Sequence, residues 1–192
     1  MTLLEDEVTE RTAEVSAHPR ARITGIVYLF YFLTAILGQL LVSRKLVVYG
    51  EVVNLISAAV YIAVTLLFYF LFKPVNRSVS LVAALFSLAG CGLMVLNLFH
   101  LATAYSPLIF FGPYCLLIGY LIFRSTFLPR ILGVLMMLAG LGWLAFLSPT
   151  VAKHLSVPLE ILGIVAEGLL MLWLVVKGVN VERWRVQASG KL

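Results

Sequence analysis

The amino-acid sequence predicts an all-α fold, a polytopic membrane protein with a bundle of six transmembrane helices and both termini in the cytoplasm. Of its 192 residues, 62% are hydrophobic and only 12% are charged. A soluble domain is roughly 45–50% apolar and about 25% charged, and a globule this small could not bury so much apolar surface. The few charges also gather between long apolar runs. These observations exclude a soluble enzyme, a disordered chain and a disulfide-stapled domain.

Residues 1–21 form a polar tail, which we expect to be partly helical and cytoplasmic. Five acidic residues precede the first apolar run: Glu5, Asp6, Glu7, Glu10 and Glu14. A secretory signal peptide begins with positive charge instead. We therefore expect the tail to remain in the mature protein.

Six apolar runs follow, and together they make residues 22–178 the predicted transmembrane domain. A helix needs about 20 apolar residues to cross the hydrocarbon layer. The runs cover residues 23–42, 47–72, 78–101, 108–123, 131–147 and 158–176. Residues 148–157, which include Pro149 and Lys153, are expected to form a polar loop.

The ends of these runs carry helix start and stop signals. Lys73 and Pro74 close the second run, and Asn76 can cap the third helix. The fourth run is short and contains Gly112-Pro113, while Pro129 precedes the fifth. These signals support six separate helices with short connections.

The distribution of Lys and Arg predicts the orientation. With six spans, eleven of the 14 basic residues fall on the side of the termini and three on the other side. Because cytoplasmic loops carry the excess of positive charge, both termini are predicted to be cytoplasmic. Residues 179–192 then form a basic cytoplasmic tail. The expected location is the cell inner (plasma) membrane, with multiple spans.

Three blocks of the sequence resemble a known family. They are GPYCLLIGYLIFRSTFLPRILGVLMMLAGLGW at 112–143, LFKPVNRSVSLVAALF at 71–86 and LWLVVKGVNVERW at 172–184. Together they are similar to the bacterial domain-of-unknown-function family 4386 over roughly residues 22–184, most specifically at 119–133. The resemblance implies a small multi-span membrane protein without an established activity. It therefore implies no catalytic residues.

Ionisable side chains at membrane depth are costly, so they are candidates for function. Glu167 lies at the midpoint of the last run, and Glu160 lies two helical turns earlier on the same face. Gly163 and Gly168 allow another helix to approach. Glu167 is predicted to be a ligand contact or a proton or cation relay, with a hydrogen bond between helices as the structural alternative. Glu160 lies near the outer interface, where snorkelling is the alternative.

Five further polar residues fall at similar depth in the outer half of the membrane. They are Gln39, Glu51, Asn54, Asn97 and His100. Two pairs have i, i+3 spacing, which places each pair on one helix face. We expect a shared polar pocket that binds a ligand, although residues on separate helices need not meet.

Arg124 and Arg130 flank the fourth loop, where they could bind lipid head groups or serve as interfacial anchors. Small residues recur on several runs and provide close packing faces, within the chain or toward an oligomer. The sequence contains no nucleotide-binding, hydrolase or metalloprotease motif. We therefore expect no metal, no cofactor and no nucleic-acid partner.

The predicted function is non-enzymatic. The protein is expected to bind a lipid or small hydrophobic ligand, or to move a small solute, through a polar pocket in the helix bundle. One alternative is an accessory or assembly subunit of a membrane complex, with a homo-oligomer or membrane-protein partner. A further alternative is an intramembrane enzyme acting on lipid or quinone, with Glu167 and His100 as acid and base.

Overall fold

The computed structural model describes residues 2–101 and 106–190, with the side chains of 2–20 and 149–153 left out of the description. Within these residues the fold is helical throughout. The helices are α1 (Thr2–Ser43), α2 (Val47–Phe72), α3 (Arg77–Leu98), α4 (Leu108–Arg124), α5 (Arg130–Ala145), α6 (Pro149–Val176) and α7 (Val181–Ala188). The all-α class predicted from the sequence is confirmed.

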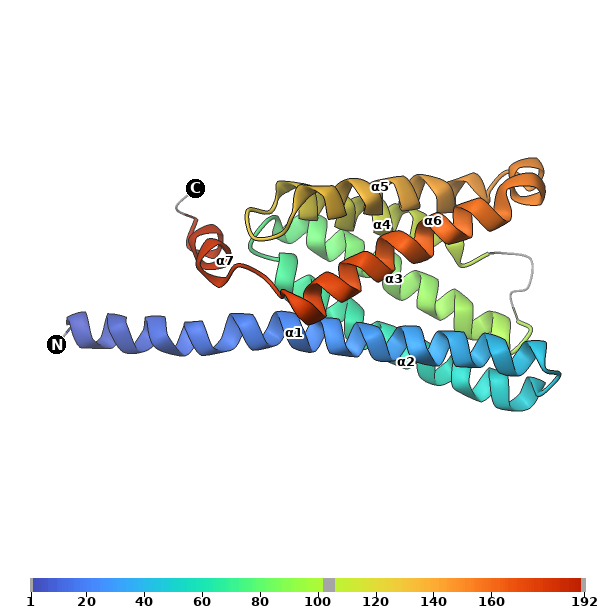
Figure 1. Ribbon diagram of the computed structural model, residues 1–192, viewed down its shortest axis with the longest axis horizontal. Coiled ribbons are helices and arrows are strands. Elements are labelled where there is room, and N and C mark those ends of the chain that lie inside the picture. Colours follow the sequence, from blue (N-terminus) through green and yellow to red (C-terminus); the bar gives the residue numbers. More distant parts are fainter. Residues whose placement is uncertain (1, 102–105, 191–192) are drawn as a thin grey trace.

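The first six helices form a closed ring. Each helix packs against the next one in the chain, and α6 packs against α1. Short connections make neighbouring helices antiparallel, as Figure 1 shows. We call the end that carries the α1–α2, α3–α4 and α5–α6 connections the distal end, and the end that carries the α2–α3 and α4–α5 connections the proximal end.

Four helical segments are long and apolar enough to cross a membrane. They are Ala21–Ser43, Val47–Phe72, Arg77–Leu98 and His154–Val176. The other two apolar helices, α4 and α5, have 17 and 16 residues, so each is roughly 25 Å long against about 30 Å of hydrocarbon. These long apolar helices indicate a membrane protein. That all six helices cross the membrane remains a prediction.

Two helices extend beyond their predicted apolar runs. Helix α1 runs without a break from Thr2 to Ser43 and extends past the bundle (Figure 1), so the polar segment 2–20, expected to be partly helical, continues the first helix. The expected loop at 148–157 is wrong, because α6 begins at Pro149. Proline is tolerated in the first turn, where its missing N–H has no helical partner. The expected basic tail contains the short helix α7.

Glycine pairs set the contact between α4 and α5. A Cβ atom at Gly133 would lie 2.6 Å from the carbonyl oxygen of Gly119, and one at Gly140 would lie 2.8 Å from that of Gly112. The two glycines on each helix are seven residues apart, which is about two helical turns. Both glycine pairs therefore lie on one antiparallel seam. The small-residue faces noted in the sequence therefore serve packing within the chain here.

Helix α7 is bound to the proximal end. The Trp184 indole Nε1 donates to the carbonyl oxygen of Leu71 at 3.0 Å. The Gln187 Oε1 accepts from both the backbone N–H and the hydroxyl of Thr126 at 3.1 Å. Since Leu71 lies in the last turn of α2 and Thr126 lies in the α4–α5 loop, α7 bridges these two parts of the proximal end.

Candidate functional site

A pocket of about 270 Å³ opens between α1, α2 and α3 at the distal end, and we call it the polar pocket. Its lining residues are Gln39, Glu51, Asn54, Met94, Asn97, Leu98, His100 and Pro107. All five outer polar residues singled out in the sequence are among them. The expected convergence of these five residues is therefore observed, although ligand binding by them stays a prediction.

Two helices supply most of the polar groups of this pocket. Glu51 and Asn54 lie one turn apart on α2, and Asn97 lies in the last turn of α3. Asn54 is buried against α1 at Gly38, where any side chain would collide with its amide oxygen. A glycine at position 38 is thus required for the amide of Asn54 to sit at the pocket.

His100 enters the pocket from a left-handed helix end. The backbone N–H of His100 donates to the Asn97 carbonyl oxygen, and that of Leu101 donates to the Leu96 carbonyl oxygen. This is the Schellman arrangement, in which glycine usually occupies the left-handed position. His100 has a φ of 58° there. A non-glycine residue in this conformation costs about 1–3 kcal/mol, and such strain is concentrated at functional sites.

The lining is amphipathic. It combines a carboxyl group, an imidazole and three amides with the apolar side chains of Met94, Leu98 and Pro107. A few convergent polar groups on an apolar wall are typical of small-molecule sites. Among the residues whose side chains are described, no group of three or more His, Cys, Asp or Glu is arranged to hold a metal ion. The mixed lining of the pocket suits the polar head of a small amphipathic molecule.

The two glutamates of α6 do not line the polar pocket. Glu160 is exposed on the side of the bundle. Glu167 lies inside the ring, where the Tyr28 hydroxyl donates to its Oε2 at 2.6 Å. The Cys115 thiol faces its Oε1 at 4.0 Å. A single pocket around Glu167, Glu160 and the outer residues is thus not what the structure shows, because Glu160 and Glu167 face different surroundings.

Aromatic side chains surround Glu167. Tyr28 is fully buried and packs on Tyr61, with ring centroids 6.3 Å apart. Tyr61 lies 4.5 Å from Tyr31 and 6.1 Å from Tyr114 by ring centroids. We call Glu167, Cys115 and these four tyrosines the inner cluster. It draws groups from α1, α2, α4 and α6 and so ties the ring together at its centre.

Sequence reasoning did not identify the tyrosines of the inner cluster. Tyrosine in membrane proteins is enriched at the interfaces, where the hydroxyl group reaches water. Tyr28, Tyr61 and Tyr114 instead lie within apolar runs. Their position away from the ends of these runs was the signal that could have found them.

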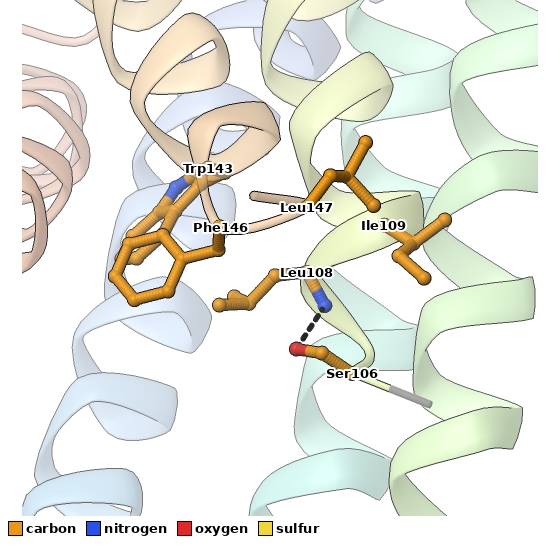
Figure 2. A pocket seen from close by; sticks show the side chains of 6 residues that line it. All are labelled: Ser106, Leu108, Ile109, Trp143, Phe146 and Leu147. Atoms are coloured by element: carbon orange, nitrogen blue, oxygen red, sulfur yellow. Dashed lines mark hydrogen bonds between the residues drawn. The ribbon is translucent and has the colours of Figure 1, made fainter. Parts of the chain in front are cut away.

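A second pocket, of about 200 Å³, lies at the distal end between α4 and α5, and we call it the Trp143 pocket. Its lining residues are Ser106, Leu108, Ile109, Trp143, Phe146 and Leu147. Figure 2 shows Trp143 and Phe146 together on the α5 side and Leu108 and Ile109 on the α4 side. The sequence did not predict this pocket.

The two arginines proposed for lipid head groups are both exposed at the proximal end. The Arg130 guanidinium lies over the Phe123 ring, 5.7 Å from its centroid. Arg124 ends α4, and its carbonyl oxygen accepts from the Gln187 side-chain amide at 3.4 Å. Both guanidinium groups are placed where head groups would lie if the bundle crosses a bilayer, and contact with lipid stays a prediction.

The fold and the two pockets define a class, the small polytopic helical membrane proteins. Within it, the chain belongs to the family described as "Domain of unknown function (DUF4386)", which matches residues 43–108 and 93–178. This confirms the family resemblance of the sequence.

An uncharacterised protein of Archaeoglobus fulgidus is 27% identical in an alignment of length 146, which covers 72% of this chain and 89% of that protein. No solved structure matches the chain. The comparisons therefore establish the family and leave the activity to be argued from the pockets.

Proposed function

We propose that this protein is a six-span protein of the inner (plasma) membrane that binds a small amphipathic ligand in the polar pocket. In this arrangement the proximal end and both termini face the cytoplasm, and the distal end faces outward. Exposed Lys73, Arg77 and Lys177 at the proximal end support this orientation, because positive charge is enriched on the cytoplasmic side.

The observation that carries the proposal is the meeting of five polar side chains from three segments around one cavity of about 270 Å³. Polar residues at membrane depth are costly and are rarely kept without a function. Glu51 and His100 offer a charged or hydrogen-bonding contact to a head group, and Met94 and Leu98 offer an apolar wall to a chain. The ligand class is therefore a lipid or a small hydrophobic molecule with a polar head.

Movement of a solute requires more than this pocket provides. Neither of the two pockets is lined by Glu167, so the described structure supports binding at the distal end rather than passage through the ring. The enzyme alternative required Glu167 and His100 to share one substrate. They belong to separate sites, the inner cluster and the polar pocket, so this alternative is not favoured.

The test is native mass spectrometry of the protein extracted gently from its own membrane. We expect the wild-type chain to retain a small molecule of defined mass. Glu51→Gln and His100→Gly should each retain at least tenfold less, because a hydrogen bond to a charged group contributes about 1.5–3 kcal/mol. His100→Gly removes the imidazole while its backbone conformation is one that glycine adopts freely.

Glu160→Gln is the matched control, because Glu160 is exposed and lines neither pocket. It should retain the ligand as the wild type does. Wild-type protein without any small molecule, or equal retention by all four chains, would contradict the proposal. Extraction as a ligand-free complex with a second protein would favour the accessory-subunit alternative instead.

A further inference from the structure

Glu167 is a carboxyl group in the centre of a helix ring, and its neighbours supply no positive charge. The titratable groups that face it are Tyr28 and Tyr31 from α1, Tyr61 from α2, Tyr114 and Cys115 from α4, and beyond these Cys91 from α3. All of these are neutral acids. Among the side chains described, no Lys, Arg or His acts on this carboxyl group. An isolated carboxylate in such surroundings is costly, whereas the neutral acid is not.

One hydrogen bond to Glu167 is already made, from the Tyr28 hydroxyl at 2.6 Å. A second donor lies beside it. The Trp143 indole Nε1 is buried beside the Glu167 carboxyl group and interacts with it as a donor, but the geometry falls short of a full hydrogen bond. A poorly aligned donor of this kind can form a full, charge-assisted hydrogen bond if the carboxyl group becomes charged.

The same indole reaches the Trp143 pocket. Trp143 forms part of the wall of that pocket beside Phe146, with the two ring centroids 5.9 Å apart (Figure 2). Its six-membered ring lies against Gly163, one helical turn before Glu167 on α6. Trp143 therefore stands between a pocket at the distal end and the buried carboxyl group.

We propose that Glu167 is a reversible proton-binding site that exchanges its proton with water in the Trp143 pocket when the Trp143 indole moves. The O–H bond of the Glu167 carboxyl group breaks and a water molecule takes the proton. The resulting carboxylate keeps the hydrogen bond from Tyr28 and accepts a second one from Trp143 Nε1. Return of a proton from water restores the neutral acid and frees the indole. This site is independent of ligand binding in the polar pocket.

The experiment is infrared spectroscopy of the full chain in lipid vesicles, followed by transfer to heavy water. We expect a carbonyl stretching band of a protonated carboxyl group that Glu167→Gln removes and Glu167→Asp moves to another frequency. Glu167→Asp keeps a proton-binding carboxyl group, so a band that moves with this change is assigned to residue 167 without relying on the fold of Glu167→Gln. Absence of any such band in the wild type would overturn the proposal.

The rate at which this band shifts in heavy water tests the route. Trp143→Phe should speed the exchange severalfold. Trp173 on α6 is half-buried like Trp143, so Trp173→Phe is the matched control and should leave the exchange unchanged. Ser106→Cys carrying a bulky maleimide should slow the exchange, because Ser106 lines the pocket and both native cysteines are buried. Exchange that none of these changes affects would overturn the Trp143 route.

Discussion

The hydrogen bond between Tyr28 and Glu167 links α1 to α6, the two helices that close the ring. Its donor-to-acceptor distance is 2.6 Å, and the Tyr28 side chain is fully buried. Without this donor, the carboxyl group of Glu167 would keep only the weak thiol contact of Cys115 at 4.0 Å and the poorly aligned indole of Trp143. This residue pair therefore contributes to the stability of the ring closure, together with the close approach of α1 to α6 at Gly25.

Replacement of Tyr28 by Phe tests this pair. The ring contacts with Phe68 and Tyr61 remain, and only the hydroxyl group is lost. We expect the free energy of unfolding to fall by about 1–2 kcal/mol, since a buried acceptor loses its partner. Thermal unfolding in detergent measures it. Tyr120→Phe is the control, because Tyr120 is 42% exposed, and an equal effect of the two changes would contradict this role of Tyr28.

At the residue scale, the depth of polar side chains predicted the polar pocket but not the inner cluster. Glu51, Asn54, Asn97 and His100 could be placed at one depth, because each lies near the outer end of its apolar run, the start of the second run or the end of the third. Which residues surround Glu167 depends on helix rotation, and an apolar run reveals little about rotation when lipid and core are equally hydrophobic. The separation of Glu160 from Glu167 has the same cause.

At the element scale, glycines on both helices bring the backbones of α4 and α5 into close contact along one seam. Leu116 and Met137 pack into the same seam, against Gly140 and Gly119. Helices in lipid gain little from the hydrophobic effect, so close backbone approach and van der Waals contact must hold them together. The two shortest apolar helices are joined in this way.

Replacement of Gly133 by Ala tests the seam. A Cβ atom there would lie 2.6 Å from the Gly119 carbonyl oxygen and 2.7 Å from the Phe123 nitrogen, both backbone atoms that cannot move independently. We expect a loss of about 1–3 kcal/mol by overpacking. Gly92→Ala is the control, because nothing lies within 4 Å of its added Cβ. It should be neutral or stabilise by up to about 1 kcal/mol. Equal thermal unfolding midpoints for the two variants would contradict the seam.

The helix boundaries show what apolar runs can and cannot predict. The run from Val47 to Phe72 matches α2 at both ends, because charged and turn-forming residues stop the helix where the apolar run stops. The helices α1 and α6 continue past their apolar runs, to Thr2 and Pro149. Hydropathy measures the part suited to hydrocarbon, whereas the backbone hydrogen bonds of a helix can continue into polar sequence.

At the scale of the whole molecule, the ring places the polar pocket and the Trp143 pocket at the distal end and α7 at the proximal end. The proximal end, including the α4–α5 loop, lies on the cytoplasmic side only if α4 and α5 both cross the membrane. They have 17 and 16 residues, so a bundle with four spans and an α4–α5 hairpin on the distal side is the competing arrangement. The two arrangements differ in the side on which the α4–α5 loop lies.

The most direct measurement is labelling of Arg124→Cys in intact cells with a membrane-impermeant maleimide. Arg124 is exposed and ends α4, while Arg130 keeps positive charge in the loop. Ser43→Cys and Ser189→Cys mark the outer and cytoplasmic sides. Six spans predict that Arg124→Cys, like Ser189→Cys, reacts only after the cells are permeabilised. Reaction of Arg124→Cys in intact cells, as with Ser43→Cys, would contradict the six-helix transmembrane ring.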